Sequence, residues 1–346
     1  MNATLSCPRP GASPALQAWV DDIDRRARTR LGMGRVADYI PALADQDPAR
    51  FGLAVCTNDG QLYTAGDAEM PFSIQSLSKV LLLSLALRRH GDALWRRVGL
   101  NPSGMPFNSL MQLETERGKP RNPFINAGAI VVADHLVGAF ATPAKHLQDV
   151  ARTLSGNPGI LIDRQVLASE WQHRARNAAA AYLMKAFGNL DNEVDEVLTA
   201  YFACCALRMS CADLAVALNY LAADGRALTT GRSFIPPDMA QRINALMFTS
   251  GMYDAAGDFA YRVGLPAKSG VGGGIVAIVP GRLSICAWSP ALDASGNSVA
   301  AQYALELIAE RLGRWRQGPR QDADPLTTGD LEEGCRSSPA PPARYC

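Results

Sequence analysis

The chain has 346 residues, of which 48% are hydrophobic and 19% charged, a globular composition that excludes global disorder. Its 34 basic and 33 acidic residues give a formal net charge of +1, so no sign-biased field attracts nucleic acid or an anionic membrane surface. No run approaches the ~20 apolar residues of a membrane-spanning helix, and no secretion signal is evident. The eight cysteines form no Cys-x-x-Cys pair and the four histidines have no metal-ligand spacing, so we expect a reduced, cytoplasmic protein without a metal.

The first part of the chain predicts a helix followed by a β-hairpin. Residues 1–14 are rich in Pro, Ser and Gly and are expected to be flexible. Residues 15–30 carry apolar side chains at helical spacing. Residues 51–56 and 61–65 flank an Asp-Gly turn, which indicates two paired strands. Residues 76–90 then predict a strongly apolar helix.

The middle of the chain predicts an alanine-rich helical region. Ser210 followed by Asp213 is a capping-box pattern, and Pro237 suits the first turn of a helix. The helices are expected at 177–187, 193–207, 211–224 and 239–248.

The last third of the chain returns to strand patterns. Short strands are predicted at 259–263, 274–279 and 283–288, followed by a closing amphipathic helix at 297–314. The polar, Pro-rich residues 316–346 are expected to form a disordered tail.

This order of elements predicts one α/β (α+β) domain, large enough for an enzyme, over residues 15–315. Consecutive short strands joined by tight turns favour antiparallel pairing. The simplest arrangement is one antiparallel sheet built from both chain ends, flanked by the terminal helices, with a helical lobe inserted. The cleft between sheet and lobe is the expected site.

The strongest chemical motif is a serine three residues before a lysine at the start of an apolar helix. Ser76 and Lys79 would lie on one helix face, and no other nearby serine has this offset. A serine hydroxyl becomes a nucleophile when a base takes its proton, and a buried lysine can be that base. Taken alone, the motif is common by chance and more often marks an ordinary solvated helix start.

A second motif, Lys268-Ser269-Gly270, precedes a run of glycines. Glycines let a strand backbone approach a ligand closely, so the amides of Val271 and Ser76 could form an oxyanion hole. Alone, Lys268 could be a basic residue at a strand edge. Together, the two motifs have the arrangement of serine β-lactamases and penicillin-binding proteins, which favours an enzyme.

The chain resembles the serine-dependent glutaminases, in their short bacterial form, from about residue 30 to about residue 312. The segments that carry the resemblance are Gly34–Pro41, Phe72–Val80, Asn122–Ile130, Ser169-Glu170, Arg176-Asn177, Tyr201, Cys205–Leu207, Gly251–Asp254 and Pro266–Val271.

The resemblance implies a β-lactamase-like fold and hydrolysis of L-glutamine to L-glutamate and ammonia without a cofactor. It implies that Ser76 is the nucleophile and Lys79 its base, with Tyr253 as a possible proton relay and Tyr39 near the substrate. It also implies a homo-oligomer, a dimer or a tetramer. The glutamine-contacting set that it implies is Ser76, Asn126, Glu170, Asn177, Tyr201, Tyr253 and the backbone of Val271.

The chemistry of glutamine fits these side chains. Glu170 supplies a carboxylate for the α-ammonium, whereas Asn126, Asn177 and the tyrosine hydroxyls can donate to the α-carboxylate. Glu170 and Asn177 would share a helical face if their segment is one continuous helix.

Two alternatives stay open. One is a β-lactam hydrolase or peptidase on the same scaffold, although Tyr253-Asp254-Ala255 does not match the Ser-x-Asn or Tyr-x-Asn triplet usual there. The other is a non-catalytic protein that binds an amino acid. The sequence does not distinguish glutamine from asparagine, because one methylene is worth only ~1–3 kcal/mol of discrimination.

Overall fold

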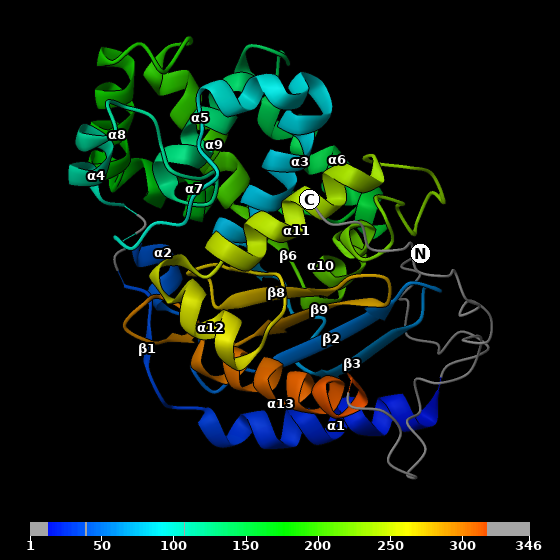
Figure 1. Cartoon of the computed structure of the whole chain (residues 1–346). Coiled ribbons are helices and arrows are strands. Elements are labelled where there is room, and N and C mark those ends of the chain that lie inside the picture. Colours follow the sequence, from blue (N-terminus) through cyan, green and yellow to red (C-terminus); the bar gives the residue numbers. More distant parts are fainter. Residues whose placement is uncertain (1–12, 39, 107, 317–346) are drawn as a thin grey trace, which may run out of the picture.

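The computed structural model describes residues 13–38, 40–106 and 108–316. A five-stranded sheet lies between a layer of terminal helices and a helical lobe (Figure 1). Its strands are β2 (Gly52–Thr57), β3 (Leu62–Gly66), β7 (Ala267–Ser269), β8 (Gly274–Val279) and β9 (Leu283–Trp288). They follow the order β3-β2-β9-β8-β7, and every neighbouring pair is antiparallel. The predicted fold class, a sheet built from both chain ends with an inserted helical lobe, is confirmed.

Both faces of the sheet are covered, which β2 illustrates. Its side chains alternate between the faces, so Leu53 and Val55 join the core with the terminal helices while Ala54 and Cys56 join the core of the helical lobe. The terminal helices are α1 (Pro14–Ala27) and α13 (Val299–Arg316), which pack against each other.

The helical lobe forms the other layer, and short elements link it to the sheet. Its helices are α3 (Ser78–His90), α4 (Leu110–Thr115), α5 (Asn126–Val137), α6 (Pro143–Ser155), α7 (Arg164–Gln172), α8 (Ala175–Ala186), α9 (Val194–Cys205), α10 (Cys211–Ala217) and α11 (Pro237–Ser250). The remaining short elements include α2 (Pro41–Ala44), α12 (Ala256–Arg262), β1 (Arg35–Val36), β4 (Phe72–Ser73), β5 (Leu161–Ile162), β6 (Leu207–Met209) and β10 (Ala291–Leu292). None of the helices in the described ranges is long and apolar enough to cross a membrane.

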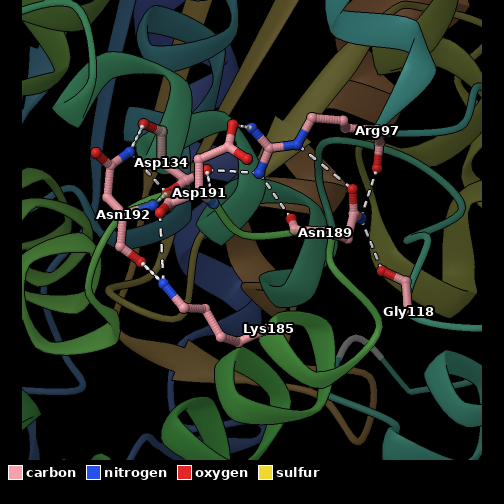
Figure 2. Close-up of polar contacts among 7 residues, drawn as sticks. All are labelled: Arg97, Gly118, Asp134, Lys185, Asn189, Asp191 and Asn192. Carbon is pink, nitrogen blue, oxygen red and sulfur yellow. Dashed lines mark hydrogen bonds and ion pairs between the residues drawn. The ribbon is translucent and has the colours of Figure 1, made fainter.

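A buried carboxylate links the last part of α5 to the segment that connects α8 with α9 (Figure 2). Asp134 on α5 is fully buried, and its side chain accepts hydrogen bonds from the guanidinium of Arg97 and from the backbone amides of Asp191 and Asn192, which lie between α8 and α9. Asn189 adds bonds to both the side chain and the carbonyl of Arg97. This Asp134 clamp ties α5 to the α8–α9 connection.

Most predicted elements are confirmed, including the β2–β3 hairpin and the capping box of Ser210 and Asp213. The strand predicted at 259–263 is wrong, because that segment belongs to α12. Phe259 and Val263 are buried and four positions apart, as on one helix face, whereas Tyr261 between them is 91% exposed. The helix predicted over 211–224 ends at Ala217 and is followed by a 3₁₀ turn. The predicted flexible N-terminus and disordered tail lie outside the described residues, apart from residues 13, 14 and 316.

Candidate active site

Ser76 lies on a strained 3₁₀ turn between β4 and α3. The turn spans Gln75–Leu77, so the α-helix begins at Ser78, slightly later than predicted. Gln75 has a φ of 49°, in the left-handed region that non-glycine residues rarely adopt. Such strain persists where the surrounding structure enforces it, typically at functional sites.

Lys79 is buried in the lobe directly behind this turn. Its side chain is 1% exposed, and Nζ donates to the carbonyl oxygen of Phe124 at 3.1 Å and to Asn126 Oδ1 at 2.7 Å. Burial lowers the pKa of Lys79 from 10.5 to about 8, an effect partly opposed by Cys205 and Glu170. An appreciable fraction of this amine is therefore neutral near physiological pH, as a general base requires.

The glycine run after β7 brings a second backbone segment against the turn of Ser76. A methyl group at position 270 would lie 2.8 Å from the carbonyl oxygen of Ile74 and 3.3 Å from the amide nitrogen of Ser76. Only glycine allows this approach at Gly270. In the described residues the amide of Val271 makes no backbone hydrogen bond, so it is available to an oxyanion together with the amide of Ser76.

Tyr253 connects Ser76 to β7. It is the second non-glycine residue of the site with a left-handed backbone, at φ 57°. Its hydroxyl donates to the carbonyl oxygen of Ser269 at 3.3 Å and shares a hydrogen bond with the Ser76 side chain. Burial raises the pKa of Tyr253, so the phenol keeps its proton at neutral pH.

Lys268 is a second fully buried lysine beside this tyrosine. Its Nζ lies 4.1 Å from the centre of the Tyr253 ring and donates to the carbonyl oxygens of Gly251 at 3.0 Å and Ser269 at 2.6 Å. Burial and, to a smaller extent, the nearby Lys79 hold the pKa of Lys268 well below its usual value.

Three predicted binding residues form a hydrogen-bonded chain in the lobe. Asn126 begins α5, and its Nδ2 donates to Asn177 Oδ1 at 3.0 Å. The hydroxyl of Tyr201 on α9 donates to Asn126 Oδ1 at 3.3 Å, the same oxygen that binds Lys79. The structure therefore brings together residues that are 75 positions apart in the sequence.

Glu170 is a buried acid at the end of α7. Burial raises its pKa from 4.5 to about 7, against the lowering effects of a hydrogen bond with Gln75 and of Lys79 and His173. The continuous helix on which Glu170 and Asn177 would share one face is not formed, since α7 ends at Gln172 and α8 begins at Ala175.

Open space adjoins this cluster on two sides. A hollow of about 620 Å³ is lined by Val271 and by charged side chains that include Arg35 and Asp254. A second, far smaller cavity has Asn126 and Asn177 in its wall. Tyr39, which was predicted near the substrate, lies outside the described residues.

Three residues of this cluster were not among the predicted site residues. Gln75 bonds to both Glu170 and Ser73, Cys205 lies against Lys79 and Tyr201, and Lys268 contacts Tyr253. The Lys268-Ser269-Gly270 motif was a usable signal for Lys268, whereas Gln75 and Cys205 lie in segments that carry the family resemblance but have no chemical motif of their own. Within the described residues no group of three His, Cys, Asp or Glu side chains could hold a metal ion.

Comparison with known proteins places these residues in a family context. A family model described as "Glutaminase" matches residues 34–315. The chain is 55% identical over 298 residues to a glutaminase of Pseudomonas fluorescens (strain Pf0-1), covering 86% of this chain and 99% of the relative. It is 59% identical over 288 residues to a glutaminase of Aeromonas salmonicida (strain A449), covering 83% of this chain and 94% of the relative.

Solved structures are similar as well. The structure titled probable glutaminase ybaS superposes with a TM-score of 0.83 at 36% identity, covering 87% of this chain and 98% of the other. The structure titled Mglu in its glutamate form has a TM-score of 0.82 at 35% identity, covering 87% of this chain and 70% of the other.

Proposed function

The chain belongs to the glutaminase family, and we propose that this glutamine amidohydrolase works through an ester between Ser76 and the γ-carbonyl carbon of its substrate. It hydrolyses L-glutamine to L-glutamate and ammonia. The observation that carries the proposal is the position of Ser76, which is hydrogen-bonded to Tyr253 and lies one helical turn before a buried lysine with a lowered pKa.

In the first half-reaction, Ser76 Oγ attacks the γ-carbonyl carbon while its proton passes to neutral Lys79, with Tyr253 as the relay. Tyr253 can pass a proton on only if it stays protonated between steps, which its raised pKa ensures. The amides of Ser76 and Val271 hold the oxyanion. The C–N bond then breaks, and the proton taken from Ser76 leaves with the ammonia.

In the second half-reaction, water attacks the γ-glutamyl ester. Lys79 takes a proton from this water, and the same two amides hold the second oxyanion. The ester bond breaks, Ser76 recovers its proton, and glutamate leaves.

Substrate recognition divides between a charged group and neutral donors. The Glu170 carboxylate binds the α-ammonium, since it is the acid of the cluster and is shielded from water. Asn126, Asn177 and Tyr201 bind the α-carboxylate. Among the described residues Asn177 Nδ2 has no hydrogen-bond partner, so it can donate to this group.

The proposal is tested by trapping the ester. Wild type mixed with glutamine and quenched in acid should carry one γ-glutamyl group on the peptide that contains Ser76, detected by mass spectrometry. Ser76→Ala should release no ammonia yet still bind glutamine in calorimetry, and Lys79→Met should lose turnover at every pH. Ammonia release by Ser76→Ala at the wild-type rate would refute the assignment. Ammonia release from asparagine, measured in parallel, shows whether the enzyme prefers the longer side chain of glutamine.

We also propose a cytoplasmic homo-oligomer, a dimer or a tetramer, on the resemblance to the family alone. Light scattering after size-exclusion chromatography distinguishes these states from a monomer.

A further inference from the structure

The turn before α5 is built around one buried side chain, that of Asn122. It is 1% exposed, and its Oδ1 accepts hydrogen bonds from the amides of Phe124 at 3.0 Å and Ile125 at 3.1 Å. Its Nδ2 donates to the carbonyl oxygen of Asn101 at 3.0 Å. An asparagine that accepts from amides two and three positions ahead fixes the backbone of a turn.

The same turn supplies both hydrogen-bond acceptors of Lys79. The carbonyl oxygen of Phe124 accepts at 3.1 Å, and Oδ1 of Asn126, the first residue of α5, accepts at 2.7 Å. The positions of both oxygens therefore depend on the backbone that the Asn122 side chain holds.

These two acceptors determine how the neutral lysine is oriented. A neutral amine has two N–H bonds and one lone pair. When both N–H bonds are directed at Phe124 and Asn126, the lone pair occupies the remaining tetrahedral direction. A loosened turn would let the amine rotate, and the lone pair would lose its fixed direction.

We propose that Asn122 is a positioning residue for Lys79, which fixes the two oxygens that orient the amine. This inference rests on the proposed role of Lys79 as the base of the reaction. Asn122 does not contact substrate in this scheme, and its effect passes through the main chain of residues 122–126.

Gly128 supplies independent support from the other side of the turn. A methyl group at position 128 would lie 1.9 Å from the carbonyl oxygen of Asn122 and 3.0 Å from Cα of Pro123. The first turn of α5 is therefore pressed against the same backbone. Any side chain at Gly128 must displace the turn without changing a polar group.

The matched pair of variants is Asn122→Ala and Asn122→Ser. Both lose the donor to Asn101, but only serine keeps an oxygen that can accept from the amide of Phe124. The informative readout is the pH dependence of kcat, which reports groups in the substrate complex, where Glu170 is paired with the substrate ammonium. Other titratable groups facing Lys79 are unchanged in both variants: Cys205 and Tyr201 on α9, Glu170 on α7, and Lys268 on β7.

In Asn122→Ala the acidic limb of the kcat profile should move to lower pH by about 0.5–1 unit, because an acceptor stabilises an ammonium more than an amine. The plateau kcat should fall about tenfold as orientation is lost. Asn122→Ser should keep the wild-type limb, and Gly128→Ala should resemble Asn122→Ala. Thermal unfolding and glutamine calorimetry of each variant establish the folded, binding-competent fraction.

A purely structural role for Asn122 predicts lower activity at every pH with an unmoved limb, and that result would overturn the inference. An equal limb shift in Asn122→Ser and Asn122→Ala would overturn it as well, since the retained acceptor would have no effect. Lys79→Met separates this failure from that of the proposed function. If Lys79→Met retains turnover, the base is misassigned; if it is inactive while the limb of Asn122→Ala is unmoved, only the positioning role fails.

Discussion

Glutamine affinity should fall as the pH drops below 7, because the proposed partner of its α-ammonium titrates there. The pKa of Glu170 is raised to about 7, mainly by burial. Only the ionised form attracts a cation, so binding requires the carboxylate. Since the substrate ammonium keeps its charge over this range, the change in affinity between pH 6 and 8 comes from the protein.

The size of the effect follows from the fraction of Glu170 that is ionised. With a pKa of about 7, roughly nine-tenths is ionised at pH 8 and roughly one-tenth at pH 6. The dissociation constant should therefore rise about tenfold between these values, and by roughly a further tenfold at pH 5. Glu170→Gln should bind weakly across the whole range and lose the pH dependence.

The assay is calorimetry of glutamine binding to Ser76→Ala. Because this variant has no turnover, the measured heat and proton exchange come from binding and not from the reaction. Titrations in buffers of different ionisation enthalpy also give the number of protons released, which should approach one near pH 6 and vanish near pH 8. The double variant Ser76→Ala/Glu170→Gln is the matched control. A dissociation constant that is the same at pH 6 and pH 8, or unchanged in the double variant, would remove Glu170 from the ammonium site.

Three further variants probe the clamp, the relay and the glycine run. Asp134→Ala should reduce the free energy of unfolding by about 3–5 kcal/mol in urea titrations, because it leaves Arg97 without its buried partner; a change below about 1 kcal/mol contradicts this. Tyr253→Phe should lower kcat by about 10²–10⁴-fold with little change in glutamine affinity, and near-normal kcat in stopped-flow assays would exclude the relay. Gly272→Ala places a methyl 2.1 Å from the carbonyl oxygen of Ser73, so it should lose activity, and full activity would show that this contact relaxes freely.

The sequence predicts those parts of the fold that depend on local patterns. The β2–β3 hairpin, the capping box of α10 and the β8–β9 pair each have a turn or cap residue beside a periodic run, and each is confirmed. The segment 259–263 fails because five residues fit a strand and a helix turn equally well. Burial of Phe259 and Val263 on one helix face decides between them, and that burial depends on distant neighbours.

The site residues likewise fall into those that a local sequence pattern predicts and those whose contacts depend on the tertiary structure. The Ser76–Lys79 spacing is a local signal, because four residues fix which side chains share a helix face. The contact of Tyr253 with Ser76, and that of Gln75 with Glu170, depend on two non-glycine residues with positive φ. No propensity predicts such backbone conformations, since only the surrounding packing enforces them.

The two layers of the fold contribute different halves of the chemistry. The end of β7 and its glycine run can approach Ser76 closely only as main chain, so in the proposed mechanism this side supplies amides for the oxyanion. The lobe supplies ionisable and amide side chains from α5, α7, α8 and α9, and it buries Lys79. A lysine base needs that burial to lose its proton near neutral pH. A buried carboxylate, in contrast, stays ionised most readily when the substrate ammonium is bound beside it. The raised pKa of Glu170 and the lowered pKa of Lys79 are therefore consequences of one dry pocket, and an opening that hydrates the pocket should return both toward their ordinary values.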